Sequence, residues 1–228
     1  MGLFGRFSSL LALLLVAGCA ESQTNSIVSK GDIPAAGYRK IVVFVEGLSA
    51  SRFTAPSLQA GNGQITLFIP VGQPVGAAAE LEEKILSALQ DAGVSAVSGE
   101  ALFKGQAISE KAKAGKVQKE FDAVLYVNVL TNGFKEYLVA GASHNGQYIW
   151  LNGEAQEIDG DIQAAYELKP DGSVWRTVPT LDAKSDLQDT KSAKQVWSGE
   201  THSTGGTLVL ASQATKELVQ KMRADGVI

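Results

Sequence analysis

Two stretches of the chain are apolar at nearly every position. Residues 41–45 read IVVFV, and residues 122–130 read DAVLYVNVL. A run without polar alternation is typical of a strand that is buried on both faces of a sheet. We therefore expect both stretches to be central strands that lie next to each other. Residues 77–92 instead repeat apolar side chains every third or fourth position, which predicts an amphipathic helix across one face of these strands.

Two more helices are indicated. Residues 108–120, rich in lysine and alanine, predict a weaker one. Residues 207–224 predict a C-terminal helix that opens after Ser203-Thr204-Gly205-Gly206, where we expect the hydroxyl groups to cap it. Its buried face would consist of apolar residues at helical spacing: Leu210, Ala211, Ala214, Leu218, Val219 and Met222.

The region between these helices has the pattern of an antiparallel meander. Asn145-Gly146 is a strong hairpin signal and predicts pairing of residues 134–143 with 147–151. Residues 157–168 alternate between apolar and polar positions, which predicts a strand with one solvated face. Residues 180–194 are polar and predict an exposed loop. The order of elements favours an α+β fold: a mixed sheet with two central strands, helices on one or both faces, a meander and a C-terminal helix.

The amino terminus has the features of an export signal. Arg6 precedes an apolar run over residues 10–20, and the chain becomes polar immediately afterwards. The run is shorter than the ~20 residues that a membrane-spanning helix needs. A charged start, a short apolar run and small residues are typical of a secretory signal peptide.

The end of this signal, Val16-Ala17-Gly18-Cys19, resembles the lipobox of bacterial lipoproteins. The resemblance implies cleavage between Gly18 and Cys19, and diacylglycerol with fatty acids such as palmitate on the Cys19 sulfur. Cleavage by the general signal peptidase is the alternative. The residue after Cys19 is Ala20 and not Asp, which by the same resemblance favours the outer membrane, facing the periplasm.

These features divide the chain into three parts. Residues 1–18 form the signal, residues 19–37 a polar lipidated tether, and residues 38–228 a single α+β domain. A flexible tether of 19 residues could reach up to roughly 60 Å. Residues 46–75, punctuated by proline and glycine, form a long connection within the domain, and a connection of this length is functional or an inserted structure.

Composition narrows the possible partners. The chain has 24 acidic and 20 basic residues, a net charge of −4. Loss of Arg6 with the signal leaves about −5, which argues against nucleic acid as a partner. Cys19 is the single cysteine, so no intramolecular disulfide can form.

Residues that could perform chemistry are few. His144 and His202 lack the spacing of a zinc site, and we expect neither a metal nor another cofactor. Glu157, Asp159 and Asp161 fall on one face of the predicted strand, where successive carboxylates lie too far apart to share one ion. We expect no catalytic residues. Three tryptophans fall in predicted strands, as core or sheet-face residues: Trp150, Trp175 and Trp197.

The succession of elements resembles a group of envelope lipoproteins. The features that carry the resemblance are KIVVFVE, LQDAGVSAV, DAVLYVNV and a terminal helix near LVQKM. The group includes the TolB amino-terminal domain, the activator lipoproteins of penicillin-binding proteins and the curli-secretion channel family.

Three functions remain open at this point. The first is a non-enzymatic envelope lipoprotein that binds a protein partner or supports envelope assembly. The second is an oligomeric secretion or export component, by analogy with the curli channel, in which the hairpin between Phe134 and Leu151 would join a barrel. The third is a small-ligand binder or enzyme that uses the carboxylates or the two histidines.

Overall fold

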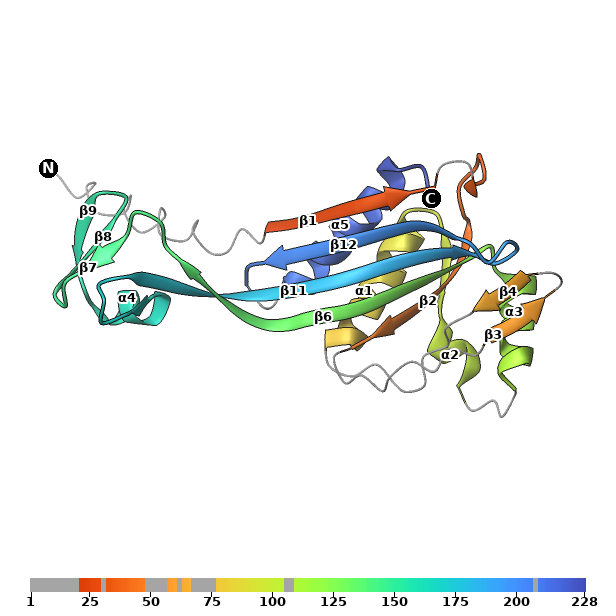
Figure 1. Ribbon diagram of the computed structural model, residues 1–228, viewed down its shortest axis with the longest axis horizontal. Coiled ribbons are helices and arrows are strands. Elements are labelled where there is room, and N and C mark those ends of the chain that lie inside the picture. Colours follow the sequence, from red (N-terminus) through yellow and green to blue (C-terminus); the bar gives the residue numbers. More distant parts are fainter. Residues whose placement is uncertain are drawn as a thin grey trace, which may run out of the picture.

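The computed structural model describes residues 21–29, 32–47, 57–60, 63–66, 77–104, 109–206 and 209–228. Its main element is a seven-stranded sheet with the order β1-β12-β11-β6-β2-β5, and β10 pairs with β11 outside this path (Figure 1). These strands are β1 (Glu21–Val28), β2 (Lys40–Glu46), β5 (Ser95–Ser98), β6 (Ala123–Leu138), β10 (Glu167–Leu168), β11 (Val174–Asp189) and β12 (Gln195–Thr204).

Five helices and two small sheets complete the described part. The helices are α1 (Ala77–Asp91), α2 (Gly99–Phe103), α3 (Glu110–Glu120), α4 (Gly160–Ala165) and α5 (Leu210–Ala224). One small sheet pairs β3 (Ser57–Ala60) with β4 (Gly63–Thr66). The other has the order β7-β8-β9, from Ser143–His144, Tyr148–Leu151 and Glu154–Glu157.

The two apolar runs form neighbouring central strands, as predicted. β2 pairs in parallel with β6 on one side and with β5 on the other, whereas β6, β11, β12 and β1 are antiparallel. The sheet is therefore mixed, and the predicted α+β class is confirmed.

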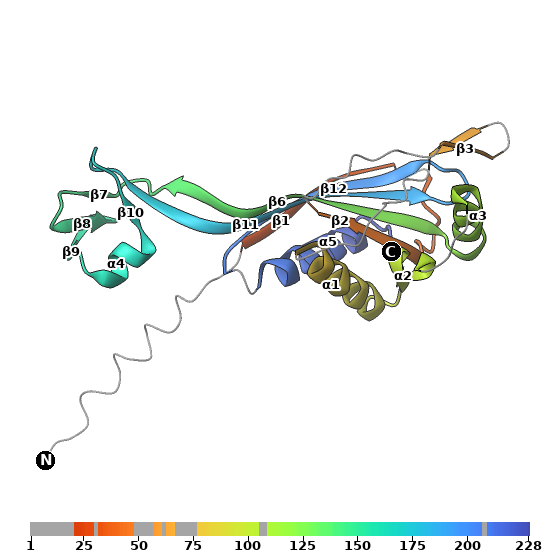
Figure 2. The ribbon, with the colours of Figure 1, turned by 90° about the horizontal axis from the view of Figure 1, so that it is seen from below.

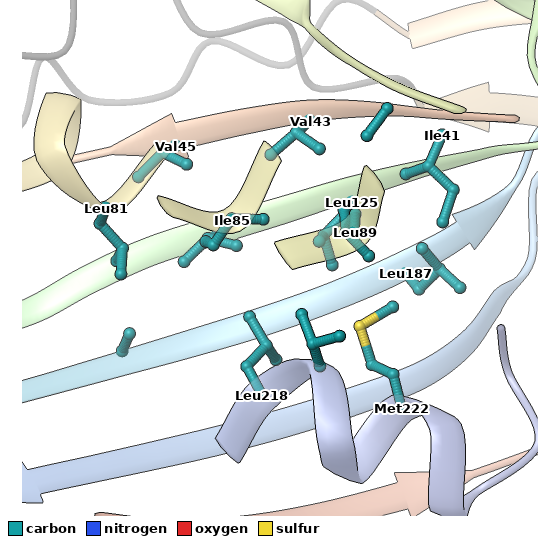
Figure 3. Packing of buried hydrophobic residues seen from close by; sticks show 14 of the residues in the cluster. Ile41, Val43, Val45, Leu81, Ile85, Leu89, Leu125, Leu187, Leu218 and Met222 are labelled. Atoms are coloured by element: carbon teal, nitrogen blue, oxygen red, sulfur yellow. The ribbon is translucent and has the colours of Figure 1, made fainter. Parts of the chain in front are cut away.

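Helices cover both faces of the sheet. On one face, α1 and α5 pack side by side, and their apolar side chains meet those of the central strands (Figures 2 and 3). The labelled residues in Figure 3 are Leu81, Ile85 and Leu89 of α1, Leu218 and Met222 of α5, and Ile41, Val43, Val45, Leu125 and Leu187 of the strands. On the other face, α2 and α3 cover Val42, Phe44 and Val124. The predicted buried face of the C-terminal helix is confirmed at all six positions.

Strand β1 corrects the reading of residues 19–37 as a flexible tether. Glu21–Val28 is an edge strand that pairs along its whole length with β12. Its inward side chains are hydroxyls: Ser22 Oγ lies 2.6 Å from Ser203 Oγ, and Thr24 Oγ1 lies 2.8 Å from Thr201 Oγ1. The folded sheet therefore includes Glu21–Val28, which the predicted domain from residue 38 onward left out.

Strand β11 corrects the predicted loop over residues 180–194. It runs through Asp189, with Leu181, Ala183, Ser185 and Leu187 buried at alternate positions. The small or polar character of Ala183 and Ser185 weakens the period-two signal, although the positions alternate correctly.

The long connection over residues 46–75 lies largely outside the described residues. Within it the structure places the hairpin of β3 and β4. No helix in the described part of the chain has the length and apolar character needed to cross a membrane.

Candidate functional site

The most distinctive feature is a long arm, residues 133–180, that projects from one end of the sheet (Figure 1). Its stem is the distal half of the antiparallel pair β6 and β11. β12 ends at Thr204, opposite Thr180, and β2 ends at Glu46, opposite Asn128. Beyond Thr180 and Gly133, the described part of the stem consists of two strands, β6 and β11. β10 joins them as a third strand at Trp175.

One face of this ribbon carries an apolar stripe. Directly opposed residues in an antiparallel pair share a face, and alternate residues return to it. Pro179 opposes Phe134, and Trp175 opposes Leu138, in register with the buried Leu181. These four residues, Phe134, Leu138, Trp175 and Pro179, are the apolar stripe.

The stripe continues the sheet face that α1 and α5 cover in the body. In the arm, the described elements leave it open: Phe134 is 67% exposed and Leu138 is 56% exposed. An isolated two-stranded ribbon is marginally stable in water, and grouped large apolar side chains on a surface mark interaction sites. The stripe is therefore the strongest candidate for a binding surface.

The other face of the arm is anchored by Asp182. Lys135 Nζ donates to Asp182 Oδ2 at 2.8 Å, and His202 Nδ1 bonds Asp182 Oδ1. Burial acts to raise the pKa of Asp182, but the hydrogen bonds from Lys135, His202 and Thr131 outweigh it and lower the pKa below its ordinary value. The same contact raises the pKa of Lys135. The cluster therefore joins β6 and β11 at the base of the arm to β12.

Residues 139–173 form the tip of the arm, and this tip is a folded unit. Strands β7, β8 and β9 make a small sheet around the buried Ile149, and the His144 amide donates to the Gly172 carbonyl. The predicted pairing of residues 134–143 with 147–151 is wrong for most of its length, because residues 134–138 pair with β11 instead. Asn152 and Gly153 have φ of 53° and 86°, as a tight hairpin turn requires.

The tip is strongly acidic. It contains six acidic residues and one lysine, so its 35 residues carry −5, while the whole chain carries −4. Glu154 and Glu157 lie on β9 and are exposed. The predicted strand over 157–168 is wrong: Asp159 caps α4 by accepting from the Ile162 amide. A local side-chain cap favours a helix turn over the extended backbone there.

The structure separates most of the residues singled out from the sequence. His144 lies in the tip, where Nε2 is 2.7 Å from the Lys169 carbonyl oxygen, whereas His202 lies in β12. The expectation that Ser203 and Thr204 cap the last helix is wrong, because both lie in β12 and α5 begins at Leu210 without a side-chain cap. Gly18 and Cys19 lie outside the described residues.

The three tryptophans lie on strands, as predicted. Trp197 is buried in the main core, and its Nε1 donates to Asp225 Oδ2 at 2.8 Å. Trp175 Nε1 donates to Ser173 Oγ at 2.9 Å. Sequence reasoning missed the apolar stripe, because a strand register is needed to bring Phe134 and Pro179 together. Within the described ranges, no group of three or more histidine, cysteine or acidic residues has metal-binding geometry.

Comparisons with known proteins complete this description. No family model and no curated protein matches the chain. A PelC dodecamer from Paraburkholderia phytofirmans is similar in structure, with 14% identity, a TM-score of 0.41, and coverage of 90% of this chain and 96% of that one.

Two other solved structures show similarity at the same level. The lipoprotein GNA1162 from Neisseria meningitidis has 16% identity and a TM-score of 0.39, covering 82% of this chain and 99% of that one. XCC0632 from Xanthomonas campestris has 13% identity and a TM-score of 0.40, covering 86% and 89%. Similarity this low carries no inference about function or assembly.

Proposed function

We propose that this chain is a lipid-anchored protein of the bacterial cell envelope that binds a protein partner through its arm and is not an enzyme. The lipobox Val16-Ala17-Gly18-Cys19 supports the anchor, and Ala20 supports the outer membrane. The partner-binding role rests on the apolar stripe of the arm.

The stripe supports binding more strongly than any other feature because it contributes little to the core. Phe134 and Leu138 are more than half exposed, whereas the sheet face that they continue is fully covered in the body. Leaving two large side chains in water has no folding benefit. Covering them with a partner surface would recover that burial, and large aromatic side chains such as Phe134 and Trp175 are effective interface anchors.

Catalysis has weaker support. His202 and Asp182 form a histidine–carboxylate pair, and Lys135 occupies the second oxygen of the same carboxylate. A general base needs its carboxylate to orient the ring toward a reacting group. Here a structural role explains the cluster, because it joins β6, β11 and β12 at the base of the arm.

An oligomeric secretion or export component is the second candidate. The observation that favours it is again the arm, because a projecting element with an exposed apolar face can join copies of one chain. In that case, the partner bound by the stripe would be a second copy.

Two measurements test the proposal. Metabolic labelling with palmitate should mark the full-length protein and not its Cys19→Ser variant. Photo-crosslinking residues placed at Phe134 and Leu138 should capture a protein in intact cells, while the same group at Lys84, exposed on α1, should not. Unlabelled wild-type protein would reject the anchor, and equal capture at all three positions would reject the arm as the binding element.

A further inference from the structure

We propose that the arm of one molecule docks against the α3 end of a second copy, with the acidic tip facing the lysines of α3. This inference rests on the proposed function and deepens it by naming the partner. The docking surface is the apolar stripe, and the charge distribution of the chain identifies what covers it.

The two ends of the molecule carry opposite charge. The tip lies at one extremity of the long axis and α3 lies toward the other (Figures 1 and 2). Residues 99–120 at the α3 end contain five lysines and three glutamates, a net charge of +2, against −5 at the tip. Opposite potentials on two surfaces favour encounter and fix orientation between them.

The α3 end presents its lysines over an apolar support. Ala114 and Val117 are buried against the sheet, which leaves the other sides of the helix facing outward. Lys113 Nζ and Lys116 Nζ each lie 5.9 Å from the centre of the Phe103 ring. A cation held above an aromatic face is positioned more firmly than one at the end of a free side chain. These two lysines therefore form a defined basic surface.

The tip presents its carboxylates outward. Glu154 and Glu157 are exposed on β9, the outer strand of the small sheet in the tip. Tyr148, 43% exposed, lies directly opposite Glu157 on the neighbouring strand. An aromatic side chain beside carboxylates suits a partner surface of lysines, because its ring can lie against their ammonium groups and methylene stems.

A lipid bilayer fits the stripe less well. Glu136 lies on the same face, between Phe134 and Leu138, and opposes Thr177. A carboxylate within an apolar surface resists transfer toward lipid. The tip, with a charge of −5, is also repelled by anionic head groups.

Membrane anchoring would favour this contact. The strand β1 begins at Glu21, so an acyl group on Cys19 would lie within ~7 Å of extended chain from the start of β1. Glu21 lies in one row across the sheet with Thr180 and Gly133 at the base of the arm. All copies would then be held at the membrane by the same end of the sheet. A contact between two different surfaces of identical molecules repeats in one direction and closes into a ring, or continues as a row.

Charge reversal and its compensation test the contact. The sample is the full-length acylated chain in detergent, and its mass is measured by light scattering at low and high salt. Glu154→Lys with Glu157→Lys should weaken association about tenfold, as should Lys113→Glu with Lys116→Glu, since each set reverses two charges and replaces attraction by repulsion. Combining all four substitutions should restore association. The matched control is Glu83→Lys with Lys84→Glu on the exposed face of α1, which should leave the mass unchanged.

A second measurement needs no variant. Zero-length carbodiimide coupling of wild-type protein should join a tip carboxylate to a lysine of α3, and mixed isotope-labelled copies should show that the bond joins two chains. A monomeric wild type would overturn the proposal, and so would association that is insensitive to the tip charges. Binding of the unacylated chain to phosphatidylethanolamine–phosphatidylglycerol vesicles through Phe134 would identify the bilayer as the occupant and also overturn it. If palmitate labels the protein but the arm crosslinks to a different protein, the proposed function stands and a second copy as the partner is rejected.

Discussion

Asp225 joins β1 to β12 and α5, which lie at opposite ends of the sequence, and its removal should destabilise the domain. Its carboxylate accepts hydrogen bonds from Ser26 Oγ of β1 at 2.6 Å, Trp197 Nε1 of β12 at 2.8 Å and Lys221 Nζ of α5 at 2.9 Å. The Asp225 side chain is 11% exposed. We therefore expect Asp225→Ala to loosen β1 and α5 together.

The cost can be estimated bond by bond. Trp197 is 1% exposed, so its N–H would lose its acceptor with little access to water, at about 1–3 kcal/mol. The bond from Ser26 contributes about 1 kcal/mol. The partly exposed pair with Lys221 adds at most about 1 kcal/mol. The sum is about 3 kcal/mol, which for a domain of this size lowers Tm by about 6–12 °C.

The effect should depend on pH in a defined direction. Burial acts to raise the pKa of Asp225, but the bonds from Lys221, Ser26 and Trp197 outweigh it and hold the pKa below its ordinary value. The unfolded value is about 3.9. A depressed folded pKa gives stabilisation that is present above the unfolded pKa and is lost as the pH falls through the folded pKa.

Thermal unfolding followed by circular dichroism measures both effects. The gap in Tm between wild type and Asp225→Ala should be constant near neutral pH and shrink below about pH 4. Ser26→Ala, which removes one bond and leaves the carboxylate in place, should cost about 1 kcal/mol and serves as the matched control. A loss in Tm of under 2 °C for Asp225→Ala at neutral pH would refute the reasoning, as would a gap that grows in acid.

Three further predictions concern stability. Gly199→Ala should lower the free energy of unfolding by about 1–3 kcal/mol, because a Cβ there would lie 2.3 Å from the buried Trp197 ring. An unchanged denaturant midpoint would contradict this packing. Asp182→Asn should lower the free energy of unfolding by about 1 kcal/mol at neutral pH and by progressively less in acid, since the pKa of Asp182 is lowered. An equal loss at pH 3 would argue against the ion pairs. Phe134→Ser with Leu138→Ser should change stability by under about 0.5 kcal/mol, because both side chains are mostly exposed; a large loss of Tm would mean that the stripe belongs to the core.

The central part of the fold was predictable because its signals are local and strong. The β-branched runs of β2 and β6 are buried on both faces, and α1 and α5 have apolar residues at helical spacing. Each of these patterns specifies an element without knowledge of its neighbours. The mixed sheet with helices on its faces follows from their order along the chain.

The edges of the sheet could not be predicted, because their stabilising contacts are nonlocal. Strand β1 has the composition of a linker, and its inward residues Ser22 and Thr24 satisfy their hydroxyls with β12, about 180 positions away. The arm has the same difficulty. Its stripe exists only because Pro179 and Trp175 return opposite Phe134 and Leu138, after the 35 residues of the tip.

The position of β1 changes what an anchor on Cys19 would do. A flexible tether over residues 19–37 would allow the domain to work up to roughly 60 Å from the bilayer. With β1 paired from Glu21 onward, one residue separates Cys19 from the sheet, and detaching β1 would break the hydroxyl pairs and the Ser26–Asp225 bond. The arm leaves the sheet at the same end as the start of β1, since Glu21, Thr204, Thr180 and Gly133 lie in one row across the sheet. An acylated Cys19 would therefore hold the base of the arm near the bilayer.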